Sequence, residues 1–223
     1  DLIIFDRYRR RGVLPLRYVT NIVEYVRKGG ALLVAVGPTF ASTLSLYNTP
    51  LGDPLPGAPT GRVIERGYKP TVTPLGRRHP ITAGLRGDDP DGPRWGRWFR
   101  QVEASLKGGM VLMQGAEASP LLILDRYGEG RVAQIMSDHI WLWARDFEGG
   151  GPQAELLRRL AHWLMKEPEL EEDGLDAKVE GGRLTITRRG LEPSTAPVTV
   201  TGPSGDEAIL ELAPAIGGRE TAS

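Results

Sequence analysis

The N-terminal end of the chain restricts the fold most, because it contains a complete strand–helix–strand pattern. The apolar runs Asp1–Asp6 (DLIIFD) and Ala31–Val36 (ALLVAV) are typical of buried strands. Between them, apolar residues recur at helical spacing over residues 16–28, and the Gly29-Gly30 pair then ends the helix. A unit of this kind joins two parallel strands by one right-handed crossover. The sequence therefore predicts an α/β domain.

More strands are expected after Thr39–Leu75, a stretch rich in proline and glycine that we interpret as long loops. The expected strands are Arg62–Ile64, Thr71–Thr73, Val102–Ser105, Met110–Gln114, Leu121–Asp125 and Arg131–Met136. Gly128 and Gly130 predict a turn that joins the last two strands as an antiparallel hairpin. The apolar spacing within Pro152–Met165 predicts a second amphipathic helix.

The composition changes at Lys166–Asp173, an acidic linker that contains a proline. Short strands separated by glycine and proline turns are expected beyond it, at Lys178–Val179, Arg183–Thr187, Val198–Thr201 and Ala208–Leu212. We therefore expect two domains: residues 1–168 as the α/β domain and residues 174–223 as a small β-rich module. Four such strands would form part of a β-sandwich, which indicates that the module is truncated.

Several of these pieces together resemble a known family. They are a strand ending in DRY, a helix ending in YVRKGGALLVAVGP, the HPIT segment, the GEGRV hairpin and a last helix before the ELEED linker. In this order they resemble the class I glutamine amidotransferase-like domain of large, membrane-anchored bacterial proteins of unassigned function. The resemblance covers about residues 1–170 and implies a flavodoxin-like sheet with flanking helices.

The same resemblance argues against amidotransferase activity. In active members a nucleophilic cysteine follows a strand, and the matching place here is Val36-Gly37-Pro38, with Thr39 as the nearest hydroxyl. The chain contains no cysteine. The family's histidine matches Ser137-Asp138-His139, but a histidine without a nucleophile has nothing to activate. The resemblance therefore implies a pseudoenzyme.

A candidate binding site is expected at the carboxyl ends of the central strands, where open α/β sheets hold their ligands. Its candidate residues are Asp6, Arg7, Tyr8, Gly37, Thr39, Ser137, Asp138, His139 and Trp141. The arginines of residues 7–13 are expected to form a solvated face. The last strand contributes to this edge only if it runs parallel to the first two, as the resemblance implies.

Asp138 and His139 are the candidates for catalysis, as an acid and a base or as two ligands of an ion. Because neighbours in an extended chain point to opposite sides, they share a site only if the strand turns there. The alternative is local: Asp138 caps the following turn and His139 packs or forms a hydrogen bond nearby.

The remaining signals are structural. No pair among His79, His139 and His162 has the helical spacing of metal ligands, so we expect no metal and no cofactor. Trp141 and Trp143 alternate like residues on one face of an extended segment, which favours core packing. Lys plus Arg and Asp plus Glu both total 28, which removes the electrostatic reason to propose a nucleic-acid partner.

Location and function stay open at this level. No apolar run reaches the roughly 20 residues needed to cross a bilayer, and the chain starts inside a strand at Asp1. We expect a soluble fragment of a membrane-anchored bacterial protein that makes no membrane contact itself, on the periplasmic or the cytoplasmic side, the former favoured. The preferred function is a non-catalytic domain that binds a protein or a small molecule. The alternatives are a hydrolase that uses Asp138 and His139 with water or a metal, and a structural oligomerisation module.

Overall fold

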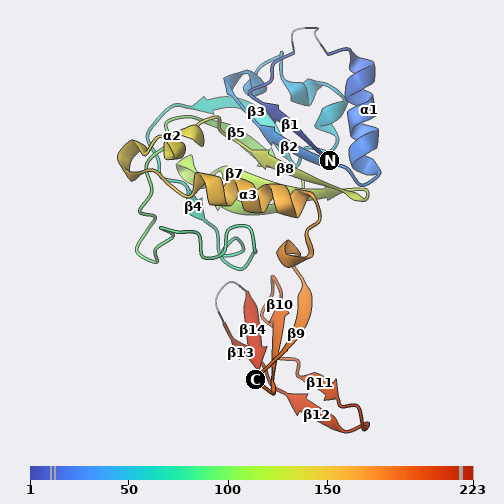
Figure 1. Ribbon diagram of the computed structural model, residues 1–223. Helices are drawn as coiled ribbons and strands as arrows, with labels where there is room; N and C mark the ends of the chain where they lie inside the picture. Colours follow the sequence, from blue (N-terminus) through green and yellow to red (C-terminus); the bar gives the residue numbers. More distant parts are fainter. Residues whose placement is uncertain (11, 13, 216–217, 223) are drawn as a thin grey trace.

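A mixed six-stranded sheet lies at the centre of the computed structural model (Figure 1), which describes residues 1–10, 12, 14–215 and 218–222. In spatial order its strands are β1 (Leu2–Asp6), β2 (Ala31–Ala35), β8 (Gly130–Ile135), β7 (Pro120–Tyr127), β6 (Met110–Gln114) and β4 (Thr71–Val72). β1, β2 and β8 are parallel, and β7, β6 and β4 alternate in direction beside them. The predicted α/β class is confirmed, with a mixed sheet.

The three parallel strands are in register, so their carboxyl ends meet at one edge. Asp6 of β1 lies beside Ala35 of β2, and Ala35 lies beside Ile135 of β8. Every residue of β8 is buried, as expected for a strand in the middle of a sheet. The predicted parallel direction of β8 and its antiparallel hairpin with β7 are both confirmed.

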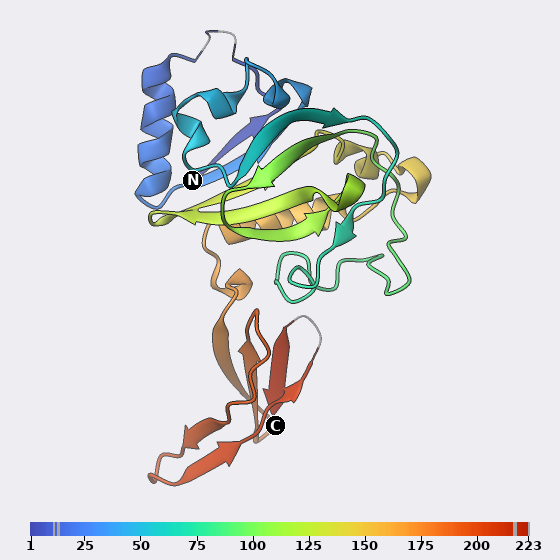
Figure 2. The ribbon, with the colours of Figure 1, turned by 180° about the vertical axis from the view of Figure 1, so that it is seen from behind.

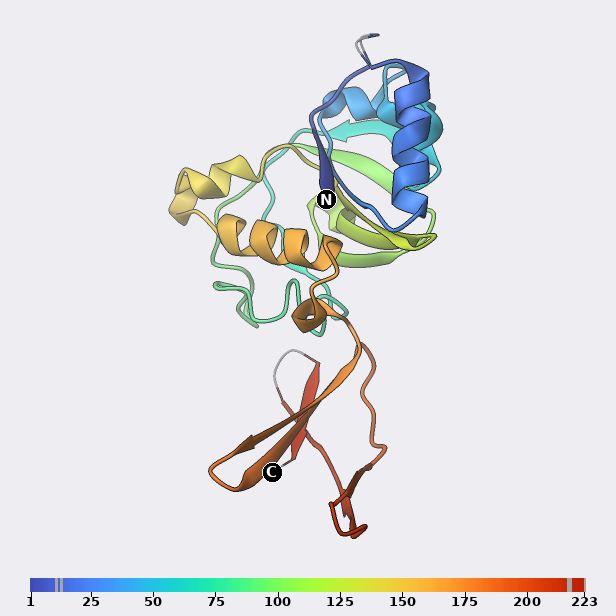
Figure 3. The same ribbon diagram turned by 45° about the vertical axis from the view of Figure 1, so that its right-hand side comes forward.

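Two amphipathic helices cover opposite faces of the sheet (Figure 3). α1 (Leu16–Arg27) buries Val19, Val23 and Val26, and its ends agree with the predicted helix to within one residue. α3 (Gln153–Leu164) buries Leu156, Leu160, Trp163 and Leu164. Among the described residues, no helix has the length and the apolar character needed to cross a bilayer.

A second, two-stranded sheet lies on the side of the central sheet away from α3 (Figure 2). It pairs β3 (Gly57–Ile64) with β5 (Gln101–Leu106), both longer than the strands expected there. The side chain of Gln134 in β8 anchors it, since Gln134 Oε1 accepts a hydrogen bond from Gly57 N at 2.8 Å. Short 3-10 helices occupy the loops, as η1 (Pro38–Ala41), η2 (Leu46–Asn48), η3 (Pro50–Gly52), η4 (Ala116–Ala118), η5 (Phe147–Gly149) and η6 (Pro168–Leu170).

The tryptophans correct one expectation. Trp141 and Trp143 lie on the short helix α2 (Trp141–Ala144) and not on an extended segment. Because a helix turns by about 100° per residue, Trp143 is buried while Trp141 is 50% exposed. Trp143 packs between Trp95 and Trp98, with ring centroids 5.3 and 4.9 Å away. These loop tryptophans therefore belong to the core.

The C-terminal residues form separate sheets below the α/β domain (Figure 1). β9 (Gly174–Glu180), β10 (Arg183–Arg189), β13 (Ala213–Pro214) and β14 (Arg219–Ala222) make a four-stranded sheet, and β11 (Val198–Thr201) pairs with β12 (Glu207–Leu210). The sequence did not predict β13 and β14, because one has two residues and the other is a mostly polar RETA. The predicted range 174–223 includes residues 216, 217 and 223, which lie outside the described residues, as do 11 and 13 of the expected N-terminal loop.

Candidate functional site at the carboxyl edge of the parallel strands

The carboxylate of Asp138, just beyond β8, is the centre of the predicted site. Arg7 Nε lies 3.0 Å from its Oδ2. Arg100 binds it with two hydrogen bonds, from Nη2 to Oδ2 at 2.7 Å and from Nε to Oδ1 at 3.2 Å. The Asp138 side chain is only 1% exposed. A buried carboxylate is stable when it is paired and hydrogen-bonded in this way.

Ser137 turns the chain so that Asp138 and His139 reach the same region. Ser137 Oγ donates to Arg100 O at 2.6 Å and accepts from His139 N at 3.1 Å. The chain has already left β8 after Ile135 and bends here, so the alternation of an extended chain does not apply. His139 Nε2 lies 3.8 Å from Asp138 Oδ1. The cap of the turn is thus Ser137, and the expected capping role of Asp138 is wrong.

Arg7 reaches Asp138 through an unusual backbone conformation. Its φ is +49°, in the left-handed region that non-glycine residues seldom adopt, while its N–H still donates to Ala35 O. Gly37 lies beside this contact, because a Cβ built there would be 3.6 Å from Arg7 Cβ and 3.7 Å from Asp138 Oδ2. The sequence indicated that Arg7 belongs to a solvated face. The structure shows that it is also an ion-pair partner of Asp138.

His139 is held in one neutral form. Phe99 N donates to its Nδ1 at 3.1 Å, which assigns the ring proton to Nε2. Burial lowers the pKa of His139 below its ordinary value, and the nearby Asp138 carboxylate only partly opposes this effect. His139 does bond through its side chain, but to a residue forty positions earlier and not to a local group.

The other predicted site residues are less closely associated with Asp138. Asp6 is exposed, and Tyr8 packs edge-on against Phe5 at 5.2 Å between centroids. Thr39 lies in η1, where its carbonyl accepts from Ser42. The exposed Trp141 has its ring centroid 6.4 Å from that of His139.

Three residues of this cluster were missed by the sequence reasoning. Arg100 supplies the second guanidinium, and Phe99 holds His139. Tyr68 Oη donates to Arg100 O at 3.3 Å, and burial raises the pKa of its phenol. A buried aspartate needs a cationic partner, and this need is the only sequence signal that points to Arg100. Several other arginines could have met the same need, so the sequence did not single out Arg100.

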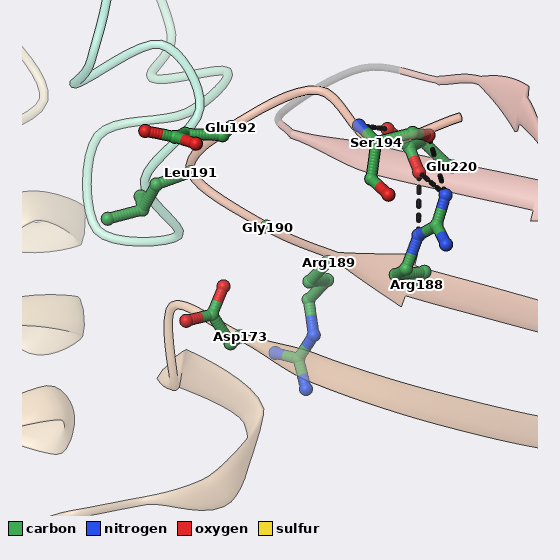
Figure 4. A pocket seen from close by; sticks show the side chains of 8 residues that line it. All are labelled: Asp173, Arg188, Arg189, Gly190, Leu191, Glu192, Ser194 and Glu220. Carbon is green, nitrogen blue, oxygen red and sulfur yellow. Dashed lines mark hydrogen bonds and ion pairs between the residues drawn. The ribbon is translucent and has the colours of Figure 1, made fainter. Parts of the chain in front are cut away.

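Two of the hollows that described residues line lie elsewhere on the molecule. One, of about 400 Å³, lies beside the linker, and Asp173, Arg189 and Glu192 are among the residues that line it (Figure 4). The other, of about 810 Å³, lies over Trp95 between Asp89 and the Gly149–Gly151 turn. Among the described residues, no group of three His, Cys, Asp or Glu side chains is placed to hold a metal ion.

Comparison with known proteins gives the fold and not the family. No protein-family model matches the sequence, and no curated protein matches it significantly. Solved structures do. The chain is similar to the cytoplasmic protein STM1381 from Salmonella typhimurium LT2, with a TM-score of 0.60, 22% identity and coverage of 74% of this chain and 71% of that one.

Two further structures extend this likeness. The cytoplasmic protein STM3548 from Salmonella typhimurium has a TM-score of 0.56 and 19% identity, again over 74% of this chain and 71% of that one. A cold-adapted β-galactosidase from Rahnella sp. R3 has a TM-score of 0.51 and 18% identity. That match covers 100% of this chain but only 32% of the β-galactosidase. At these identities the similarity concerns the fold alone.

Proposed function

We propose that this chain is a non-catalytic, class I glutamine amidotransferase-like domain that binds a protein or a small molecule as part of a larger protein. The parallel strands β1, β2 and β8 support this reading, because they bring the segments that match the family's two catalytic positions to one edge. The segment that matches the nucleophile position is Val36-Gly37-Pro38, and the chain has no cysteine.

The observation that carries the proposal is the pairing of Asp138. Its carboxylate is enclosed and contacted by two guanidinium groups. A carboxylate that orients a histidine holds the ring nitrogen at hydrogen-bond distance, whereas His139 Nε2 lies 3.8 Å from Asp138 Oδ1. The closest contacts of the Asp138 carboxylate are with Arg7 and Arg100. These ion pairs connect the ends of β1, β5 and β8, so we assign the cluster a structural role.

The hydrolase alternative meets a second obstacle in His139. A histidine acts as a general base through a ring nitrogen with a free lone pair. Nδ1 already accepts from Phe99 N, and Nε2 then carries the proton. Neither nitrogen is therefore available to take a proton from water in this arrangement.

The likeness to a longer protein supports a role within a larger chain. The whole chain, including its C-terminal sheets, matches 32% of the Rahnella β-galactosidase. The membrane-anchored parent stays a proposal that rests on the sequence resemblance. The two Salmonella structures are of cytoplasmic proteins, which does not support the periplasmic side.

Stability measurements on Asp138→Asn test the proposal. If the cluster is structural, this variant loses about 2–3 kcal/mol of unfolding free energy, because two guanidinium groups lose their anion. Functional residues are often neutral or costly for stability, so removing one tends to stabilise the fold. Asp6→Asn, an exposed acid at the same edge, is the matched control. An Asp138→Asn variant as stable as the wild type or more so would contradict the proposal.

A further inference from the structure

The two edge strands of the central sheet, β1 and β4, differ in how well they are protected against pairing with strands of other chains. β4 has only two residues and lies between Pro70 and Pro74. β1 has five residues, no proline and no lysine, and it pairs with β2 without a bulge from Leu2 to Asp6. Natural sheets protect their edges with short strands, prolines, lysines or bulges, because an open edge pairs with other chains. β4 has such protection and β1 lacks it.

The outer side of β1 offers free backbone groups. Arg7 N donates to Ala35 O of the neighbouring strand. Because successive residues of a strand direct their N–H and C=O groups to alternate sides, those of Leu2, Ile4 and Asp6 point away from β2. Among the described residues no other strand pairs with this side of β1. The side chain of Ile4, in the middle of the strand, is 58% exposed.

An apolar stripe of α1 continues this edge. Tyr18, Ile22 and Tyr25 are spaced four and three residues apart, so they lie on one side of the helix. That side faces β1, since Tyr25 Oη donates to Asp1 O. Tyr18 is 45% exposed and Ile22 is partly buried. Figure 3 shows α1 lying beside β1 at this border of the molecule.

We propose that the β1 edges of two copies of this chain pair antiparallel about a two-fold axis at Ile4. The pairing is self-complementary, because Ile4 then meets Ile4 and Leu2 lies opposite Asp6 of the second copy. It also brings Asp1 near the second copy's Arg7, whose guanidinium pairs with Asp138 of its own chain but is 59% exposed. The outward groups of Leu2, Ile4 and Asp6 are in phase for this ladder. The two six-stranded sheets become one continuous sheet.

This inference goes beyond the proposed function, because it concerns the outer side of β1 and not the buried Asp138 carboxylate. If the protein is an inactive monomer, the strand pairing is wrong and the proposed non-catalytic function is unaffected. If it is a catalytically active dimer, the strand pairing is supported and the proposed non-catalytic function is wrong.

Sedimentation of the full chain is the first test. We expect a dimer for the wild type and a folded monomer for Ile4→Pro, since proline is tolerated where the N–H points away from the ladder. Ile4→Lys, which adds the charge that protected edges carry, should give the same result. Ile209→Lys, at an exposed position in β12, is the control and should remain dimeric. A monomeric wild type at about 100 µM, or a dimeric Ile4→Pro variant, would overturn the proposal.

Cross-linking tests the register. The chain has no cysteine, so Ile4→Cys introduces a single thiol. Directly opposed hydrogen-bonded residues have Cα atoms about 5.5 Å apart, within the roughly 4.4–6.8 Å range of disulfides. Mild oxidation should give a covalent dimer of Ile4→Cys and much less of Ile209→Cys. Equal yields from both variants would show that the contact is random.

Discussion

Glu172, in the linker, lies in a buried socket with its Oε1 3.5 Å from Nε2 of His79. Trp163 Nε1 donates to the same carboxylate at 3.0 Å and Arg126 Nη2 at 2.6 Å. His79 is fully buried, and its Nδ1 accepts from Ile81 N at 3.2 Å. The neighbouring Arg78 donates to the carbonyls of Gly190 and Leu191 in the C-terminal part. The loop that carries both residues therefore anchors the chain just before β9 begins.

Glu172→Gln should weaken this anchor. Its loss leaves Arg126 and His79 without their anionic partner, and we expect unfolding free energy to fall by about 2 kcal/mol. Denaturant unfolding measures this change. Glu167→Gln, an exposed linker position, is the matched control and should change stability by less than about 0.5 kcal/mol. Equal effects of the two variants would contradict the role of the socket.

The same carboxylate should give a pH dependence at low pH. Burial by itself would raise the pKa of Glu172, but the contacts with His79 and Arg126 outweigh it and lower the pKa to about 2. The folded protein thus binds fewer protons at Glu172 than the unfolded chain. Its stabilisation is complete above the ordinary pKa of 4.5 and is lost as the pH falls towards 2. The stability difference between wild type and Glu172→Gln should shrink over this range; a constant difference would refute the assignment.

His139 should also make the protein less stable as the pH falls, but at a pH closer to neutral than Glu172 does. Burial lowers the pKa of His139 below 6.5 in the folded state, so the unfolded chain takes up the proton first. Stability should fall as the pH drops through about 6.5. His139→Asn keeps an acceptor for Phe99 N but does not titrate, and should flatten this part of a melting-temperature profile. His162→Gln, on the partly exposed side of α3, is the control. A His139→Asn profile that parallels the wild type would contradict this expectation.

The C-terminal sheets should exchange amide hydrogens faster than the central sheet. Among the described residues 174–215 and 218–222, Ile186 is the one buried apolar side chain, whereas the first four residues of β2 are all buried. Small units bury too little surface to be stable alone. Hydrogen exchange read by mass spectrometry should show β9 and β10 open well before β2. Equal protection would mean that both parts unfold as one unit.

The elements that the sequence predicted are those whose signal is local. Apolar periodicity located α1 and α3 within one residue at each end, and the GEGRV turn located the β7–β8 hairpin. β13 and β14 carry no such signal, because their stability comes from pairing with β10 and with each other. The parallel direction of β8 was predicted from the family resemblance and not from periodicity.

The site shows the same division. The common edge of Arg7 and Gly37 follows from the topology of the strand–helix–strand unit, so the sequence could predict it, whereas Asp138 was expected at this edge from the family resemblance. The pairing of Asp138 with Arg100 could not be predicted, because it depends on how β5 crosses behind the sheet after a long irregular loop. Trp141 and Trp143 were misplaced for a related reason: four residues are too few to distinguish a helical turn from a strand.

Turnover assays test the central claim, that this edge is a structural tie and not a catalytic centre. Purified chain should release no ammonia from glutamine and should not hydrolyse a panel of ester, amide and glycoside substrates above the buffer rate. Asp138→Asn and His139→Asn should behave like the wild type. Turnover that persists through repurification and is lost in both variants, with the fold intact by circular dichroism, would contradict the account.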